Sequence, residues 1–372
     1  MAYVAVKGGE KAIANSIELL KLWRGEGSAS LETEVLVTRM KQLIDRVMCE
    51  AGFYAPEYAA AALKQSEGSL EEAVFLMRAY RSTLSRNYNS LVIDCREMRL
   101  IRRVSAAFKD IPLGQILGAT YDYTHRLIDF SLINENEDEL NAFKKRYEQF
   151  GLDFEIPPSM TAGRVSDLLR EEGFISACEK DDSEPYDVTQ NKLMFPASRS
   201  ARLQTLFRAD TGFISGVAYS GLRGYGFMAH PTIGELRCGY AEIKIPYPLD
   251  TKDGEAESAV IGEILFTEVE GFVSSGKETN KKNDELQIEI GYGLSFGRAE
   301  TKAIAMSILD TALDSPHPEN PPNNEEFVLL HGEALEMSGF ISHLKLPHYV
   351  TYQSQLDNIR KTRRNNENDQ AR

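Results

Sequence analysis

Apolar residues recur every three or four positions through most of the first 150 residues, a period that predicts amphipathic helices. The predicted helices cover the following residues: 10–23, 32–49, 57–66, 70–83, 96–109 and 137–149. The helix at 70–83 follows Ser69, and Glu72 comes three residues later, which is the spacing of a capping box. Residues 3–6 instead have the composition of a short strand. We therefore predict a mainly helical N-terminal part.

The pattern changes after two proline-containing stretches without a regular period, 151–160 and 179–197. Beyond them, β-branched and aromatic residues lie between glycines and predict strands at the following residues: 212–220, 240–245, 261–272 and 286–290. A helical period returns at 299–313 and 324–337. The second half of the chain therefore combines strands with helices.

These patterns predict an α+β fold, in which a mainly helical N-terminal part is followed by a mixed α/β C-terminal part with an antiparallel-rich sheet. We divide the chain as follows: a mainly helical domain at 1–150, a loop-rich connector at 151–197, an α+β domain at 198–356 and a polar tail at 357–372. The tail is almost entirely polar, so we expect it to be frayed. Residues 273–285 and 314–324 are expected to be exposed loops.

Composition narrows the classes of function. The 372 residues carry a net charge of −14, which argues against long-range attraction to nucleic acid or to an anionic membrane. No apolar run approaches the ~20 residues that span a bilayer, and no signal-peptide pattern opens the chain. The four cysteines are widely spaced and fit reduced thiols. We expect a cytoplasmic protein with no nucleic-acid partner and no membrane partner.

Two of the six histidines, His343 and His348, lie five residues apart with Pro347 between them. Neither a regular helix nor a flat strand would point them the same way, but a proline-bent turn could bring both imidazoles to one ion. Such a two-histidine half-site needs further ligands. In the simpler alternative, His343 is a core residue and His348 a surface residue, and spacing alone favours that alternative.

A second candidate site lies at 121–130. On a helix, Asp122, His125, Arg126 and Asp129 would share one face. A histidine between two carboxylates would have its charged form favoured and could act as an acid or a base. A solvated, ion-paired face explains the same spacing.

A third candidate site is locally basic within an acidic chain. Arg199, Arg202 and Arg223 lie among serines and glycines, and Glu235 and Arg237 follow. Guanidinium groups suit phosphate oxygens because they donate two parallel hydrogen bonds. The alternative is an ion-paired surface, since the first two arginines lie three residues apart on a possible helix.

Carboxylates that could stabilise a ribosyl cation also occur in the second half. Glu263 and Glu268 lie in a predicted strand, and Glu325 and Glu326 precede His331. Breaking an N-glycosidic bond passes through an oxocarbenium-like state that a carboxylate stabilises. Taken singly, each of these residues is more simply read as structural.

Long ordered motifs add a resemblance. The chain contains MRLIRRVSAAFKDIP, GQILGATYDYTHRLIDF, SRSARLQ, AYSGLRGYG, GYGLSFG, EEFVLLH and GFISHLKLPHYV. In these segments it resembles the I subunit of the bacterial carbon–phosphorus lyase core complex, the PhnI family, from residue 1 to about residue 356.

The resemblance implies a role in phosphonate catabolism. Members of the family act with G, H and L partners to displace adenine from Mg-ATP, which attaches methylphosphonate to C1′ of the ribose and gives α-D-ribose 1-methylphosphonate 5-triphosphate. The isolated subunit resembles a purine nucleotide nucleosidase. The family also implies contacts with the G, H and J subunits, a possible K subunit, and two copies in a symmetric core complex.

The resemblance also bears on single residues. His343 and His348 match a metal-binding pair near the J subunit, for which zinc or another divalent metal is expected. We further interpret Arg199, Arg202 and Arg223 as the binding site for the ATP triphosphate, and His125, Asp129 and Glu235 as candidate catalytic groups. Two alternatives remain open: a non-catalytic scaffold subunit, and a free-standing metallohydrolase that would use His331 as a third ligand.

Overall fold

The computed structural model describes residues 8–26, 30–149, 163–176, 183–225, 230–248, 258–274, 287–315 and 317–370. The predicted strand at 3–6 lies outside the described residues, as do Cys178 and most of the predicted loop at 273–285.

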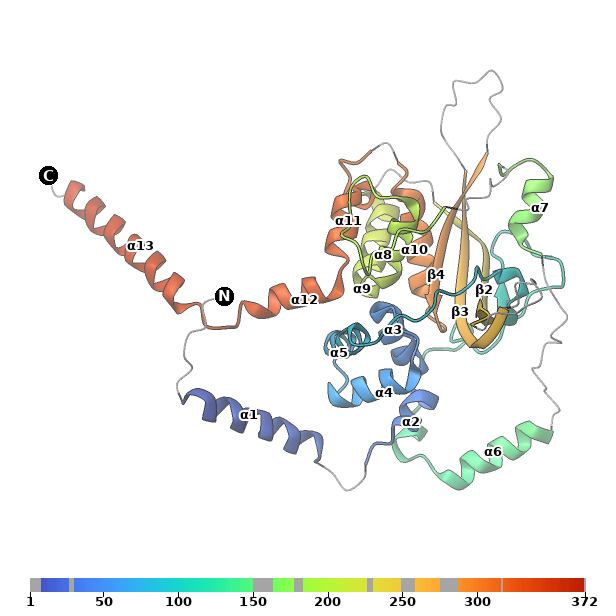
Figure 1. The fold of residues 1–372 in the computed structure, drawn as a ribbon, viewed down its shortest axis with the longest axis horizontal. Coiled ribbons are helices and arrows are strands. Elements are labelled where there is room, and N and C mark those ends of the chain that lie inside the picture. Colours follow the sequence, from blue (N-terminus) through green and yellow to red (C-terminus); the bar gives the residue numbers. More distant parts are fainter. Residues whose placement is uncertain are drawn as a thin grey trace, which may run out of the picture.

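Helices make up most of the described chain (Figure 1). The helices of the described residues are α1 (Gly9–Arg24), α2 (Thr33–Arg39), α3 (Lys41–Ala51), α4 (Pro56–Gln65), α5 (Leu70–Ser82), α6 (Glu137–Gln149), α7 (Val165–Glu171), α8 (Arg199–Arg208), α9 (Thr211–Ser220), α10 (Glu300–Ala312), α11 (Glu325–His331), α12 (Ala334–His343) and α13 (Tyr349–Gln370). The strands are β1 (Arg99–Val104), β2 (Thr232–Pro246), β3 (Ser258–Ser274) and β4 (Ile288–Phe296).

The four strands form one antiparallel sheet in the order β1-β2-β3-β4. β1 comes from the helical N-terminal part and pairs with β2 in the second half. The predicted α+β fold with an antiparallel sheet is therefore confirmed. The division into domains stays a prediction.

One face of the sheet lies directly on α10, and glycines in β4 make this approach close enough. A Cβ on Gly293 would lie 1.8 Å from the carbonyl oxygen of Ala303, and one on Gly291 would lie 2.0 Å from that of Ser307. Leu236 and Val269 pack against α10 from this face. Because the apolar side chains point toward α10, the opposite face receives the intervening charged residues of the strands.

Two hydrophobic cores hold the helices together. In one, α3, α4 and α5 bury mostly small residues around Val47, Met48 and Val74. In the other, α8, α9, α10 and α11 pack around Leu309 and Leu329. Figure 1 shows the first group beneath the sheet and the second beside it.

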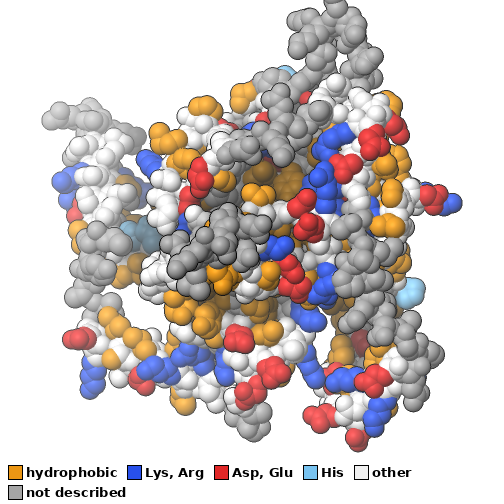
Figure 2. All heavy atoms as spheres, turned by 45° about the vertical axis from the view of Figure 1, so that its right-hand side comes forward, with side chains coloured by type: hydrophobic (Ala, Val, Ile, Leu, Met, Phe, Trp, Pro, Cys, Tyr) orange, Lys and Arg blue, Asp and Glu red, His pale blue; other side chains and the backbone are white. Residues whose placement is uncertain are grey.

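Four helices extend away from this body: α1, α6, α12 and α13 (Figure 1). α1 buries none of its residues, although Ile13, Ile17 and Leu20 form an apolar stripe along it. The space-filling view likewise shows hydrophobic side chains exposed between charged ones (Figure 2). No described helix is both long enough and apolar enough to cross a bilayer.

Three predictions of secondary structure are wrong. In the predicted helix at 96–109, residues 99–104 form strand β1, because the apolar run is short enough to fit either period and β2 supplies a pairing partner. The predicted strand at 212–220 is helix α9, which Asp210 caps and which buries Ile214, Val217 and Ala218 on one face. The predicted polar tail is not frayed at 357–370, where it continues helix α13.

Two predicted long helices are each divided into two. The helix at 32–49 is interrupted at Met40, where α2 ends and α3 begins. The helix predicted at 324–337 is interrupted at Gly332, which follows the end of α11 at His331, and α12 begins at Ala334. Ser69 does cap α5, since its hydroxyl accepts the backbone N–H of Glu72.

Candidate functional site

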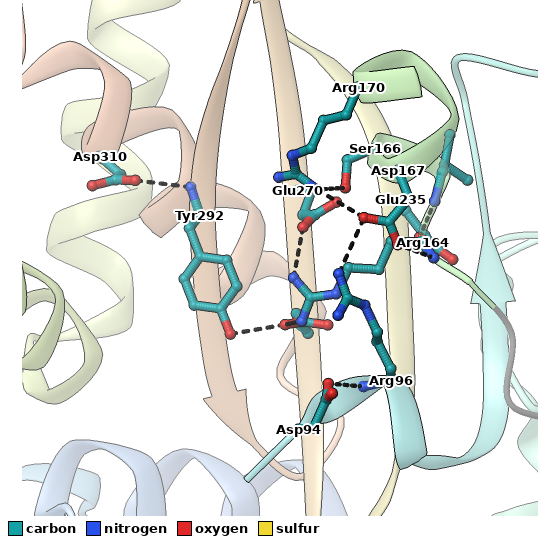
Figure 3. A network of polar contacts seen from close by, with 12 residues as sticks. Asp94, Arg96, Arg164, Ser166, Asp167, Arg170, Glu235, Glu270, Tyr292 and Asp310 are labelled. Carbon is teal, nitrogen blue, oxygen red and sulfur yellow. Dashed lines mark hydrogen bonds and ion pairs between the residues drawn. The ribbon is translucent and has the colours of Figure 1, made fainter. Parts of the chain in front are cut away.

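A network of charged side chains covers the face of the sheet that points away from α10 (Figure 3). It arises from alternation along the strands, because Glu235 and Arg237 in β2 and Glu268 and Glu270 in β3 occupy every second position. The strand register places Arg237 opposite Glu268. All four residues are buried.

Arg103 and Glu235 form a fully buried ion pair between β1 and β2. Arg103 Nε donates to Glu235 Oε1 at 2.5 Å, and its remaining donors reach the carbonyl oxygens of Pro112 and Gly163. The second oxygen of Glu235 accepts the backbone N–H of Val165 at 2.9 Å. The pair therefore fastens the N-terminal end of α7 to the sheet.

Arg164 binds two carboxylates at once. It donates to Glu268 at 2.7 Å and to Glu270 at 2.8 Å, and the Tyr292 hydroxyl also donates to Glu268 at 2.9 Å. Figure 3 shows the Tyr292 ring extending from β4 toward Arg164. Burial raises the pKa of Glu268 and raises that of Tyr292 well above its usual range.

The network leaves several buried polar atoms without partners among the described residues. All three nitrogens of the Arg237 guanidinium lack a hydrogen bond, as do Oε2 of Glu268 and Oε2 of Glu270. Cys95 lies near them, and burial, with Glu268 next in effect, raises its pKa to about 12. A buried polar group without a partner costs free energy, so these atoms fit ordered water or a small polar ligand.

Chemically, the network combines a carboxyl group that can hold a proton with fixed positive charges. A carboxyl whose pKa is raised can hold a proton nearer neutrality than usual, and Glu268 has Tyr292 as a hydrogen-bond partner in either form. Arg164 and Arg237 supply positive charge beside it.

The three predicted catalytic residues have different surroundings: two are exposed and one is buried. His125 and Asp129 are on an exposed segment that is not a helix, which corrects the predicted shared face; Arg126 there has a left-handed φ of 52°. Asp129 binds Ser131, and its exposed carboxylate has its pKa lowered by that hydrogen bond. Glu235 is buried in the network, and no hydrogen bond or ion pair of the described residues joins it to the other two.

The predicted arginine site is ion-paired. Arg199 binds Asp310 at 2.6 Å, and Arg202 binds Asp314 at 2.8 Å, both on or beside α10. Arg223 lies with its guanidinium carbon 6.0 Å from the centre of the Tyr219 ring. Asp310 also accepts the backbone N–H of Tyr292 at 2.9 Å, so it connects Arg199 to the network on the sheet.

His343 and His348 come together, as the proline-bent turn predicts. Their ring centres are 5.3 Å apart; His343 is partly exposed and His348 is exposed. Nδ1 of His343 contacts the carbonyl oxygen of Phe340, and Nδ1 of His348 lies 2.6 Å from that of Leu346. This leaves each Nε2 available to a ligand. Within the described part of the chain, no third histidine, cysteine or carboxylate completes a cluster with them.

Comparison with known proteins gives the family. Residues 2–366 match the model of the bacterial phosphonate metabolism protein PhnI. The chain belongs to the PhnI family. It is 42% identical over 370 residues to the alpha-D-ribose 1-methylphosphonate 5-triphosphate synthase subunit PhnI of Escherichia coli K12, an alignment that covers 96% of this chain and 98% of that protein.

A second PhnI relative supports the same assignment. The subunit of the same name from Rhizobium meliloti 1021 is 40% identical over 380 residues, covering 99% of this chain and 97% of that protein. The match to PhnI is thus full-length, and it places this chain in phosphonate metabolism as the PhnI subunit of the carbon–phosphorus lyase system.

Sequence reasoning missed part of the network of this PhnI chain. Arg103, Arg164 and Tyr292 were not singled out, because their partners are more than 20 residues away. One signal was available: acidic residues at every second position of a predicted strand, as in Glu268 and Glu270, place charge on one face of a buried sheet.

Proposed function

We propose that this chain is the PhnI subunit of an α-D-ribose 1-methylphosphonate 5-triphosphate synthase, in which adenine is displaced from C1′ of Mg-ATP by methylphosphonate together with G, H and L subunits. The full-length similarity to two proteins named for that synthase carries the proposal. In the assembled core complex the chain would contact G, H and J subunits in two copies, in the cytoplasm.

The proposed displacement breaks the C1′–N9 bond and forms a bond from C1′ to a phosphonate oxygen. The electron pair of the broken bond leaves with adenine, which takes up a proton. His125 is the proposed donor of that proton, and the exposed Asp129 carboxylate the proposed stabiliser of the ribosyl cation. Glu235 is held by Arg103 and Val165, so we assign it a positioning role.

The triphosphate needs a cationic site. Arg199, Arg202 and Arg223 are one candidate site for it, and there Arg199 and Arg202 would have to exchange Asp310 and Asp314 for phosphate oxygens. An exposed ion pair is worth about 0–1 kcal/mol, but each of these pairs has one mostly buried partner, Asp310 in the first and Arg202 in the second, so the exchange costs more than it would at an exposed pair. Asp310 is buried and would be left without its cation.

His343 and His348 fit a divalent metal such as zinc as two of its ligands. The contact of each Nδ1 with a backbone carbonyl favours the tautomer that carries hydrogen there, which leaves Nε2 as the ligand atom. Further ligands would come from water or from a partner subunit such as J. A partly exposed His343 beside an exposed His348 suits a metal held at a boundary between subunits.

The test is release of adenine from Mg-ATP, followed by chromatography. We expect the purified chain alone to release adenine with water as the acceptor, and the mixture with G, H and L subunits to form the methylphosphonate adduct. His125→Ala in that mixture should slow the release. Absence of adenine and of adduct from every combination that contains the chain would overturn the proposal.

A scaffold role is the second candidate, because α1, α12 and α13 extend from the body with apolar residues exposed. This alternative predicts that the same mixture keeps full activity when His125 and Asp129 are both changed to Ala. It also predicts loss of assembly when the exposed helices are removed.

A further inference from the structure

Arginines gather at the C-terminal end of α3, and two of them have no ion pair among the described residues. Arg78 and Arg81 come from α5, Arg208 ends α8, and Arg86 follows α5. The chain as a whole carries a net charge of −14, so a local excess of positive charge is unusual in it.

Arg81 and Arg208 meet over Gly52, the residue that ends α3. A Cβ on Gly52 would lie 3.1 Å from Arg81 Nη1 and 3.4 Å from Arg208 Cδ. Arg81 donates to the carbonyl oxygens of Ala51 and Gly52 at 3.1 Å each. Both arginine side chains are partly exposed, so solvent and solutes can reach them.

The acids near this cluster are already used. Glu333 pairs with Arg78, and Asp187 pairs with Arg86 at 2.5 Å. Asp187 also accepts from Thr189. No ion pair joins Arg81 or Arg208 to a carboxylate of the described residues.

Arg208 is the least satisfied member. Its Nε is buried and has no hydrogen-bond partner among the described residues. Burial and the charge of Arg81 lower its pKa, and burial followed by the charges of Arg208 and Arg81 lowers the pKa of Arg78 to about 9. Burial is the main cause of both shifts, and the neighbouring arginine charges add to it against the opposing charge of nearby acids, so an anion bound beside these arginines would favour their charged forms.

We propose that Arg81 and Arg208 bind an oligophosphate, which for the proposed function is the triphosphate of Mg-ATP. The anion site itself rests on the geometry around Gly52, and only the identity of the anion rests on the proposed function. Guanidinium groups suit it because each donates a planar pair of hydrogen bonds to phosphate oxygens. Arg86 lies at the exposed edge, where it can pass from Asp187 to a phosphate.

Arg208 offers a clean test, because its guanidinium makes no hydrogen bond to the described fold. Arg208→Met keeps a stem of similar length over Gly52 and removes the charge. Without ligand, we expect this variant to melt at the same temperature as wild type or higher, since repulsion is removed. Arg208→Lys keeps the positive charge but lacks the paired hydrogen-bond donors of the guanidinium group.

Binding of inorganic tripolyphosphate to the full-length chain is measured by titration calorimetry. We expect Arg208→Met to weaken binding about ten- to hundredfold and Arg208→Lys to weaken it less. Tripolyphosphate should raise the melting temperature of wild type but not that of Arg208→Met. The matched control is Arg360→Met, on exposed α13, which should bind as wild type does.

Equal binding by wild type and Arg208→Met would overturn the site, as would a loss confined to Arg199→Met and Arg223→Met. Adenine release separates this inference from the proposed function. If tripolyphosphate binding depends on Arg208 but no adenine is ever released, the anion site stands and the synthase assignment fails. If adenine is released and Arg208→Met leaves the KM for ATP unchanged, the synthase assignment stands and the triphosphate lies elsewhere.

Discussion

At the scale of single residues, Asp45 is a buried carboxyl beside a tight turn. It accepts the backbone N–H of Arg298 at 2.8 Å, and Gly297 precedes that residue with a φ of +64°. A Cβ on Gly297 would collide with the Asp45 carboxyl. Burial raises the pKa of Asp45 to about 6. The charged form of Asp45 is therefore disfavoured by folding.

Asp45 should make stability depend on pH. Because its pKa is raised above the unfolded value, the folded state binds more protons between the two values, and stability falls as pH rises through about 6. Between pH 5 and pH 7.5 the loss should be roughly 1–1.5 kcal/mol. Urea denaturation at both pH values should show this difference reduced in Asp45→Asn. An equal change in the free energy of unfolding between the two pH values in wild type and in Asp45→Asn would contradict this prediction. Asp138→Asn, at an exposed position, is the control.

Glu235 should matter for folding before it matters for catalysis. Glu235→Ala leaves Arg103 buried without its carboxylate, which should cost about 3–5 kcal/mol and lower the melting temperature without any substrate. The double variant Arg103→Met, Glu235→Leu removes both charges and should lose less. A Glu235→Ala protein with wild-type stability but no adenine release would instead give this residue a direct role in the chemistry.

At the scale of elements, the contact between β4 and α10 fixes the sheet against the second helical core. Its closeness depends on Gly291 and Gly293, since any side chain there would meet the backbone of α10. The same contact sets Asp310 of α10 against the backbone of Tyr292. The packing of one helix thus positions the strand that carries a network residue.

Gly293→Ala should destabilise the protein by at least 1–3 kcal/mol, because its methyl group would overlap the carbonyl of Ala303. Gly339→Ala in α12 is the matched control, as nothing lies within 4 Å of its added Cβ. That control should leave the free energy of unfolding unchanged or raise it by up to about 1 kcal/mol. Equal denaturation midpoints for the two variants would show that β4 and α10 can separate at little cost.

The turn after α12 should hold a divalent metal. In the purified complex, His343→Ala and His348→Ala should each lose bound metal, with circular dichroism unchanged, because neither side chain is buried in a hydrophobic core. His331→Ala, whose Nδ1 contacts its own helix, should retain the metal. Elemental analysis of the purified complex measures the bound metal. A metal content in the double variant equal to that of wild type would show that these two histidines do not bind it.

At the scale of the whole molecule, the extended helices give the chain a surface suited to partners. α1 exposes Ile13, Ile17 and Leu20, and the segment at 121–133 exposes several large apolar residues. Apolar patches of this extent usually mark interaction surfaces. This agrees with a family whose members are subunits of a larger system.

The isolated chain should therefore associate with itself. We expect a broad mass distribution in sedimentation velocity, which becomes a single species when partner subunits are added. Ile13→Lys with Ile17→Lys should reduce self-association without changing the melting temperature, because α1 buries nothing. A stable, monodisperse wild-type monomer at high concentration would show that these surfaces need no partner.

The sequence by itself determined the fold class, most helices and the family. Periodicity sufficed wherever a helix has one long apolar face, as in α4, α5 and α10. It offered the meeting of His343 and His348 at a proline-bent turn as one of two alternatives, and the structure, with 5.3 Å between the ring centres, chose between them. These features depend on neighbours along the chain, which a sequence displays directly.

Tertiary structure decided what depends on distant partners. The segment at 99–104 is a strand because β2 lies beside it, and the segment at 211–220 is a helix because α10 covers its apolar face. Arg199 and Arg202 have the spacing of an anion site, yet they face acids more than 100 residues away. Nothing in the sequence distinguishes Arg208 from Arg199 and Arg202. Only its packing over Gly52 leaves its guanidinium without an ion pair to a carboxylate of the described residues. Which acid pairs with an arginine depends on neighbours in three dimensions. The sequence could therefore suggest arginines for an anion site, but only the fold shows which of them lack a paired acid.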